Sequence, residues 1–328
     1  MISNKFLVLI SIFILFSCSK PVKEEKITLE GAVFGTTYKI VYLNTSINYQ
    51  KSIDSLFLLM NTSLSTYIPS SDISRINSGD TTVVVDDLFL EVFKKSKRIH
   101  KETNGYFDPT VGNLVNAWGF GPKNEKRNLT ATEIQELMQF VGLDFVKIVD
   151  RQVFKKEAKI YLDFNSIAKG FGIDVVARFL TSKKITNYLV EIGGEIRAKG
   201  TKNNNIPWLI KIVDPTNEVL LQKYKSINLS NRSMATSGNY RKYRFTENGQ
   251  KFVHTINPIT GQALESNLLS ASVIANLDCA DVDAYATAFM AMGLKKSKKF
   301  LQEHPLIDGV LLFIDDDGRL KEYSTINN

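Results

Sequence analysis

The chain has 328 residues, 44% of them hydrophobic and 23% charged, a balance that excludes a disordered chain and a fibrous protein. The net charge is +7, but the basic residues are scattered and do not alternate with aromatic residues, so we expect a solvated basic surface and no nucleic-acid partner. Three His and two Cys are too few for a His-rich metal site, a four-cysteine zinc site or a disulfide framework.

The first residues are typical of a bacterial export signal. Lys5 provides a positive charge, and the apolar run from Phe6 to Phe16 is shorter than the roughly 20 residues of a membrane-spanning helix. The run ends in Leu15-Phe16-Ser17-Cys18, which resembles the lipobox of bacterial lipoproteins. We expect a lipoprotein signal peptide over 1–17, lipidation at Cys18 and a tether over 18–27; a secretory signal or an uncleaved anchor is the alternative. The body, 28–328, is then extracytoplasmic, on the periplasmic side, and lipid-anchored to a bacterial membrane.

In chain order, residues 27–42 predict two strands around a central glycine. Apolar residues at helical spacing then predict helices over 48–64, 86–101 and 134–140. A strand over 159–164, a helix over 166–182 and a strand pair over 188–199 follow, and a last helix begins near Asp281 and ends at Gly293. Helices and short strands mix without regular β-α-β alternation, which predicts an α+β fold with mostly antiparallel sheets.

The common nucleotide-binding and hydrolase fingerprints are absent, and small, polar and acidic residues gather instead in four segments. In the first, Asp108-Pro109-Thr110 follows an aromatic pair and can present a carboxylate, a hydroxyl and backbone amides to a ligand, or form a surface turn. In the second, Asp163-Phe164-Asn165-Ser166 joins a strand to a helix with Lys169 in its first turn. That arrangement suits a phosphate group, although a simple helix cap would use the same residues.

The other two segments contain a histidine and a carboxylate. His254 follows a strand and precedes an Asn-Pro turn, which suits a proton-transfer residue or a structural histidine. Asp283 and Thr287 are four residues apart and share a helix face, about 6 Å apart along the axis. Their oxygens suit Mg²⁺, although a local hydrogen bond between them is the alternative.

Taken together, the segments resemble the ApbE family of FAD:protein FMN transferases over nearly the whole body of the chain. The matching stretches are, in the family's order, Phe34–Tyr38, Leu64–Tyr67 with Ser71–Asn77, Asn104–Pro122, Asp163–Gly172 with Asp174, Glu191–Gly194, Ser237–Arg241, His254–Gly261 and Asp283–Gly293. The resemblance implies the ApbE-like (T-fold-like) architecture and leaves open two subdomains with FAD between them.

The resemblance also implies covalent flavinylation. FAD is the substrate and Mg²⁺ the cofactor; a Thr or Ser hydroxyl of a target protein attacks the FMN-side phosphorus, AMP leaves, and FMN stays attached through a phosphoester. The family's metal ligands fall on the Ser166 carbonyl and the side chains of Asp283 and Thr287, and its base falls on His254. Flavin and adenine contacts fall at Phe34, Tyr67, Asp108, Pro109, Thr110, Asp163, Lys169 and Ile256. The implied targets are membrane redox subunits of the Na⁺-translocating quinone reductase or Rnf type and other flavinylated extracytoplasmic proteins.

Three positions depart from the family pattern. Asn165-Ser166 replaces Gly-Ala, Phe34 stands where Met is common, and Asn257 replaces an Asp. A backbone carbonyl ligand survives a side-chain change, so we expect the metal site to persist, whereas the role of position 257 is open. Two other functions compete: a Mg²⁺-dependent FAD pyrophosphatase that gives FMN and AMP from the same site, and a non-catalytic flavin-binding lipoprotein.

Overall fold

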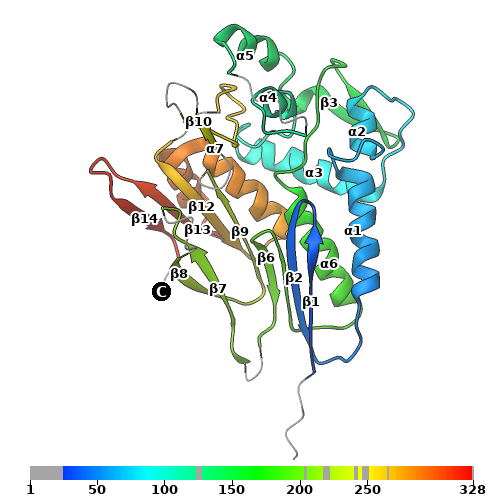
Figure 1. Ribbon diagram of the computed structural model, residues 1–328, viewed down its shortest axis with the longest axis vertical. Helices are drawn as coiled ribbons and strands as arrows, with labels where there is room; N and C mark the ends of the chain where they lie inside the picture. Colours follow the sequence, from blue (N-terminus) through cyan, green and yellow to red (C-terminus); the bar gives the residue numbers. More distant parts are fainter. Residues whose placement is uncertain are drawn as a thin grey trace, which may run out of the picture.

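The computed structural model describes residues 25–122, 128–202, 205–216, 222–239, 243–245, 251–263 and 266–326. An eight-stranded sheet in the order β1-β2-β5-β6-β9-β12-β13-β14 forms its centre (Figure 1). Every neighbouring pair in that sheet is antiparallel, which confirms the predicted α+β class. The strands of the large sheet are β1 (Lys26–Val33), β2 (Thr36–Leu43), β5 (Tyr188–Ile192), β6 (Glu195–Lys199), β9 (Arg232–Gly238), β12 (Leu268–Ala275), β13 (Ile307–Ile314) and β14 (Leu320–Ser324).

Three two-stranded sheets and a set of helices complete the described fold. The short sheets pair β3 (Val146–Val149) with β4 (Gln152–Lys155), β7 (Trp208–Val213) with β8 (Lys223–Leu229), and β10 (Tyr243–Phe245) with β11 (Lys251–Val253). The helices are α1 (Gln50–Leu64), α2 (Asp72–Asn77), α3 (Asp87–Glu102), α4 (Gly112–Ala117), α5 (Ala131–Met138), α6 (Ala168–Ser182) and α7 (Cys279–Glu303), with a 3₁₀ turn over Leu143–Phe145.

The two faces of the large sheet are covered differently. The main core lies between one face and the helices α1, α3, α6 and α7. The opposite face packs against β7 and β8 through a second apolar cluster that includes Trp208, Ile210 and Leu229. Because strand residues alternate between the faces, the sequence of each central strand determines which side chains reach the helical layer.

The amphipathic helices form where the apolar spacing predicts them. α1 buries Ile53, Phe57 and Met60 on one face. α3 begins after Asp86, whose carboxylate accepts a hydrogen bond from the Phe89 N–H at 2.8 Å and so caps the first turn. The third predicted helix, over 134–140, is α5 and lies over Ala131–Met138, because a capping box between Thr130 and Glu133 starts it earlier.

The predicted strand over 159–164 is wrong. Among the described residues this segment forms one isolated parallel bridge, between Val111 and Tyr161. Its backbone groups bond elsewhere, because Leu162 exchanges two hydrogen bonds of 2.8 Å with the Asn77 side chain and the Asp163 N–H donates to the Pro109 carbonyl at 2.7 Å. A strand needs a ladder partner, and these long-range contacts replace it.

The last helix was predicted to end at Gly293, and this is correct only for the first of the two helical parts of α7. Gly293 has φ 74° and ψ 174°, outside the helical region, so the helix breaks there. Helical structure then resumes and continues to Glu303.

The described chain begins just before the large sheet, and β1 starts at Lys26, two residues before the expected start of the body. The proposed signal peptide and Cys18 lie outside the described residues. In the described part of the chain, none of the helices has both the length and the apolar character needed to cross a membrane.

Candidate functional site

The candidate site is built where the N-terminal ends of α6 and α7 touch. A Cβ atom placed on Gly170 would lie 2.4 Å from the Cys279 carbonyl oxygen, closer than any real contact. Gly170 therefore permits a backbone-to-backbone approach between the two helices that no other residue would allow. This contact brings the first turn of α6 next to the Asp283 turn of α7.

Asp283 is the buried carboxylate at this contact. Its side chain is 3% exposed, and its Oδ2 accepts a hydrogen bond from the Gly170 N–H at 3.0 Å. In a continuing helix the N–H of residue 170 would go to the Ser166 carbonyl, four residues earlier, so Asp283 here takes its place. Burial raises the pKa of Asp283 to about 7, and the nearby Lys169 opposes that rise.

Lys169 forms an ion pair with a second buried acid, Glu195. The Lys169 Nζ lies 2.6 Å from the Glu195 Oε1, and the two side chains are 31% and 4% exposed. Burial alone would lower the pKa of Lys169, but Asp283 and Glu195 outweigh this effect and raise it. The lysine is thus a charged group between two carboxylates, with one side open toward solvent.

Thr287 lies one turn beyond Asp283 on the same face of α7. Its hydroxyl is 3.2 Å from the hydroxyl of Ser237, near the end of β9. The structure therefore brings Lys169, Asp283 and Thr287 to one place. Thr287 has a partner on the sheet, whereas the Asp283 carboxylate accepts a hydrogen bond from α6.

A network of buried charges fixes the start of α7. The Asp174 carboxylate, on α6, accepts hydrogen bonds from the N–H groups of Cys279 and Ala280 at 2.8 and 2.9 Å. Arg197 then joins Asp174 to Asp278. Burial raises the pKa of Asp174 to about 6, although Arg197 opposes the rise. The network ties α6, β6 and α7 together just before the Asp283 turn.

Phe34 forms an apolar wall beside α6. It lies in the tight turn between β1 and β2 with φ 50°, a left-handed conformation that is uncommon for a bulky side chain. Its ring is in edge contact with Phe57, with centroids 5.6 Å apart. A Cβ atom on Gly172 would meet the Phe34 ring at 2.7 Å, so the ring packs directly onto the first turns of α6.

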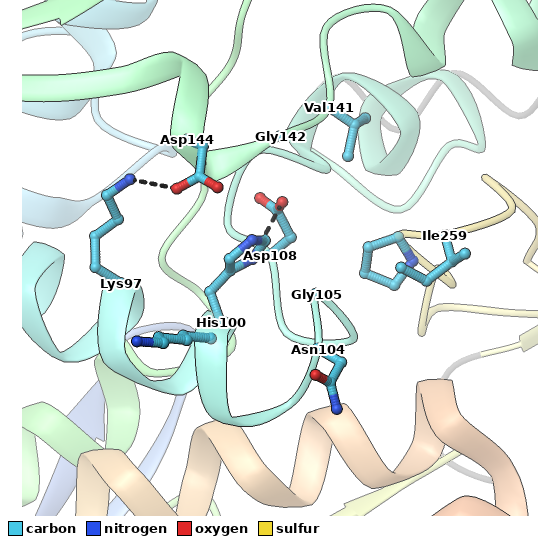
Figure 2. A pocket seen from close by; sticks show the side chains of 11 residues that line it. Lys97, His100, Asn104, Gly105, Asp108, Val141, Gly142, Asp144 and Ile259 are labelled. Atoms are coloured by element: carbon cyan, nitrogen blue, oxygen red, sulfur yellow. Dashed lines mark hydrogen bonds and ion pairs between the residues drawn. The ribbon is translucent and has the colours of Figure 1, made fainter.

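The Asp108-Pro109-Thr110 turn is tied to the protein by its own polar groups. Asp108 Oδ1 accepts hydrogen bonds from the N–H and the hydroxyl of Thr110, and Asp108 Oδ2 accepts one from the Leu143 N–H at 3.1 Å. His100 approaches the same carboxylate at 3.4 Å and borders a cavity of about 710 Å³ together with Asp108 (Figure 2). The Asp108 side chain thus fixes the turn, and the Pro109 carbonyl accepts the Asp163 N–H.

Asp163 lies close enough to Tyr67 to influence the ionisation of its hydroxyl. Asp163 is buried and accepts a hydrogen bond from the Asn165 N–H at 2.8 Å. Burial raises its pKa to about 6. Tyr67 is 57% exposed. Its pKa is raised mainly by partial burial and to a smaller extent by the charge of Asp163. A buried carboxylate beside an exposed aromatic ring suits a flat polar ligand.

His254 lies in a loop that side chains anchor on two sides. Ile256 is buried in a small apolar cluster with Trp118, and the Trp118 indole donates to the Gly261 carbonyl at 2.9 Å. The Asn257 side-chain amide donates to the Ala291 carbonyl of α7 at 3.2 Å. An aspartate could not donate this bond, so the departure from the family pattern gives Asn257 a structural function. The anchor lies one helical turn past Thr287.

The side chains present fit a magnesium ion in the way the resemblance implies. Mg²⁺ prefers oxygen ligands, keeps several waters and commonly shares substrate phosphates, so one carboxylate, one hydroxyl and one carbonyl are a sufficient protein contribution. Asp283 and Thr287 offer the carboxylate and the hydroxyl on one face of α7, and the resemblance would add the Ser166 carbonyl. Within the described residues no group of three or more His, Cys, Asp and Glu is arranged to hold a metal alone.

Comparison with known proteins identifies the family. The model of the ApbE family matches residues 34–311. A curated FAD:protein FMN transferase of Vibrio cholerae is 35% identical over 98% of this chain and 97% of the relative; one of Haemophilus influenzae is 36% identical over 93% and 90%. The chain belongs to the ApbE family. A solved structure, flavin transferase ApbE from Vibrio cholerae, has TM-score 0.80 and 34% identity, covering 92% of this chain and 97% of that one. The apo form of Pseudomonas stutzeri flavinyl transferase ApbE has TM-score 0.83 and 28% identity, covering 92% and 95%.

Within this ApbE-family site, sequence reasoning overlooked Glu195. The residue follows the Gly193-Gly194 turn and begins β6, and nothing in its local sequence distinguishes it from a surface glutamate. Its partner Lys169 is 26 residues earlier in the chain. Its position becomes clear only in the fold, where the alternation of β6 puts Glu195 on the face opposite Ile196, and Ile196 faces β7 and β8.

Proposed function

We propose that this protein is an FAD:protein FMN transferase, which attaches FMN through a phosphoester to a Thr or Ser hydroxyl of a target protein and releases AMP. Membership of the ApbE family supports this function, and the curated relatives carry that name. The observation that carries the proposal is that the α6–α7 contact places the Lys169 ammonium within the electrostatic influence of the buried Asp283, because a cation near a buried carboxylate suits a pyrophosphate bound together with a metal ion.

Each residue has a distinct task in the proposed reaction. The Ser166 carbonyl, Asp283 and Thr287 would hold Mg²⁺, which when bound supplies neutralisation of phosphate charge. Lys169 binds the pyrophosphate, and Phe34 provides an apolar wall for a ring. His254 accepts the proton of the attacking hydroxyl while the hydroxyl oxygen forms a bond to the FMN-side phosphorus. The bond from that phosphorus to the bridging oxygen breaks, and AMP leaves with the electron pair.

The acceptor distinguishes this reaction from hydrolysis, in which water replaces the hydroxyl. The decisive experiment incubates the protein with FAD, Mg²⁺ and a protein domain that carries the acceptor Thr, followed by mass spectrometry of that domain. A mass gain equal to FMN less one water, with AMP in equal amount, supports the transferase. Free FMN and AMP with an unmodified domain would show a pyrophosphatase instead. Absence of all products would leave a flavin-binding protein.

We also propose that the protein is lipid-anchored on the extracytoplasmic side of a bacterial membrane. The support is the Leu15-Phe16-Ser17-Cys18 motif at the end of the apolar run. Targets at the same surface would be membrane redox subunits with extracytoplasmic flavin domains, of the Na⁺-translocating quinone reductase or Rnf type. Mass spectrometry of such a subunit, co-expressed with this protein, tests the pairing.

A further inference from the structure

Glu195 is a buried acid with only one of its oxygens in use. It is the first residue of β6, its side chain is 4% exposed, and its Oε1 pairs with the Lys169 Nζ at 2.6 Å. Its Oε2 is buried and has no hydrogen-bond partner among the described residues. A buried carboxylate oxygen without a donor is costly to the folded protein, so its retention calls for an explanation by function.

The surroundings of Oε2 belong to the site. A Cβ atom on Gly193 would come within 3.4 Å of this oxygen and within 2.9 Å of the Thr36 side chain. Thr36 follows the Phe34-Gly35 turn, and Gly193 has φ 64°. The oxygen thus lies close to the Gly193-Gly194 turn and to Thr36, and its carboxylate holds the Lys169 ammonium.

Hydroxyl groups are the donors that a dinucleotide offers at this position. In FAD the ribose and ribityl hydroxyls flank the pyrophosphate on both sides. A carboxylate that holds a pyrophosphate-binding ammonium with one oxygen can therefore offer its second oxygen to such a hydroxyl. Carboxylates that accept from sugar hydroxyls are a general means of recognising dinucleotides.

We propose that Glu195 is a substrate-binding residue of this site. Its Oε1 holds the Lys169 ammonium, and its Oε2 accepts a hydrogen bond from a sugar hydroxyl of the bound dinucleotide. The inference rests on the proposed function in taking FAD as the ligand, but it concerns binding and does not require transfer. It gives the protein a contact that is sensitive to the sugar as well as to the phosphates.

The test is a titration of the full chain with FAD, followed by flavin fluorescence, for three proteins. Glu195→Gln keeps the shape but places an amide donor where the acceptor was, so we expect the Kd for FAD to rise about tenfold or more. Glu191→Gln is the matched control. Glu191 lies on the same hairpin but borders the cavity on the β7–β8 side and accepts the Gly194 N–H at 2.7 Å, which a glutamine can also accept. We expect its Kd to stay within about twofold of the parent.

Repeating the Glu195→Gln substitution in a protein that lacks the Lys169 ammonium shows whether Glu195 contacts FAD directly or acts only through Lys169. Lys169→Gln removes the ammonium but retains a donor for Oε1, and Glu195→Gln added to it should still raise the Kd for FAD about fivefold or more. Loss of the Glu195 effect in that background would overturn the acceptor role, as would an unchanged Kd for Glu195→Gln alone. If Glu195→Gln does not fold, Glu195→Asp, which keeps the charge and shortens the reach, must show the same weakening at an unchanged Tm.

The outcomes also separate this inference from the proposed function. A parent protein that binds FAD without modifying an acceptor would refute the transferase and leave the Glu195 contact to be judged by its own Kd. A parent that modifies the acceptor, with Glu195→Gln binding FAD equally well, would refute the contact alone. A parent that does not bind FAD would refute both.

Discussion

Asp283 is the residue on which the proposed metal site depends most. Asp283→Asn preserves size and can still accept the Gly170 N–H, but it removes the negative charge. We therefore expect the rate of FMN transfer to fall by about 10² or more, and the Mg²⁺ concentration needed for half of the remaining rate to rise, while FAD still binds. The measurement is transfer to an acceptor domain over a Mg²⁺ titration.

Asp281→Asn is the matched control for that experiment. Asp281 is two residues earlier on α7 and pairs with Lys95 at 3.2 Å and Arg98 at 2.7 Å, both on α3. Loss of the Asp281 charge should lower the Tm and leave the Mg²⁺ dependence of transfer unchanged. Equal Mg²⁺ titrations for Asp283→Asn and the parent would remove Asp283 from the metal site.

His254 is expected to act on the rate and not on FAD affinity. A positioned general base typically contributes about 10²–10⁴ in rate, so His254→Ala should slow transfer by that factor, with the Kd for FAD within a few-fold of the parent. His304→Gln serves as the control because His304 stacks on Phe300 at the end of α7, with centroids 3.9 Å apart. Single-turnover transfer after mixing enzyme-bound FAD with the acceptor measures the effect. A parent-like rate in His254→Ala would exclude this base.

Asp163 connects the site to the pH dependence of stability. Its folded-state pKa of about 6 exceeds the ordinary value of roughly 3.9, so between these pH values the folded protein binds the proton and the unfolded chain does not. Because of Asp163, the free energy of unfolding therefore falls as pH rises from about 4 to 6. Above pH 6 this loss of stability stays constant. Asp163→Asn should be more stable than the parent by about 2–3 kcal/mol at pH 8 and nearly equal at pH 4, while FAD binding weakens.

Urea unfolding of both proteins across pH 4–8 measures this difference. A stability gap between Asp163→Asn and the parent that does not change with pH would contradict the assignment of the buried charge. We expect Asp163→Asn to gain stability and to lose FAD affinity for a general reason. A buried carboxylate that lowers the stability of the protein is characteristic of functional sites.

At the scale of elements, the contact between α6 and α7 depends on one glycine. Gly170→Ala would force a Cβ atom against the backbone of residues 279–280, which cannot move without moving the Asp283 turn. We expect a loss of about 3 kcal/mol or more in the free energy of unfolding, larger than the gain of about 1 kcal/mol in helix propensity, and a matching loss of transfer. Denaturant unfolding and the transfer assay measure the two effects.

Gly172→Ala is the comparison for Gly170→Ala. Its Cβ atom would meet the far ends of two side chains, the Phe34 ring and the Met60 methyl group, and no backbone, so the side chains can shift. We expect a change in stability within about 1 kcal/mol of the parent. If the two alanine variants were equally stable, the close backbone approach at Gly170 would not be the feature that fixes the two helices.

The elements also show what the sequence could and could not reveal. The spans of α1 and α3 were predictable because their apolar spacing and the Asp86 cap are local. The segment over 159–164 was predicted wrongly because its partners, Asn77 and Pro109, are distant in the chain. The set of Lys169, Asp283 and Thr287 could be inferred from the family resemblance, whereas the Lys169–Glu195 pair required the fold.

For the whole molecule, the sheet separates a site face from a supporting face. The helices that carry Lys169 and Asp283 pack on one side, and β7 and β8 close the other. The described chain starts at residue 25, near the end of the proposed tether over 18–27, and β1 begins at Lys26. The chemistry and the membrane attachment are therefore predicted to be separable, with the body supplying the site and Cys18 supplying the location.

Replacing Cys18 tests that separation. Cys18→Ser removes the thiol that would carry the lipid, so the protein should move from the membrane fraction to the soluble fraction and lose the mass of the lipid. Transfer to a soluble acceptor domain should match that of the parent, because no residue of the body changes. Flavinylation of a membrane-bound target in cells should fall, since anchoring to the same surface raises the effective concentration of the two partners. A Cys18→Ser protein that stayed in the membrane fraction would show that another segment anchors the chain.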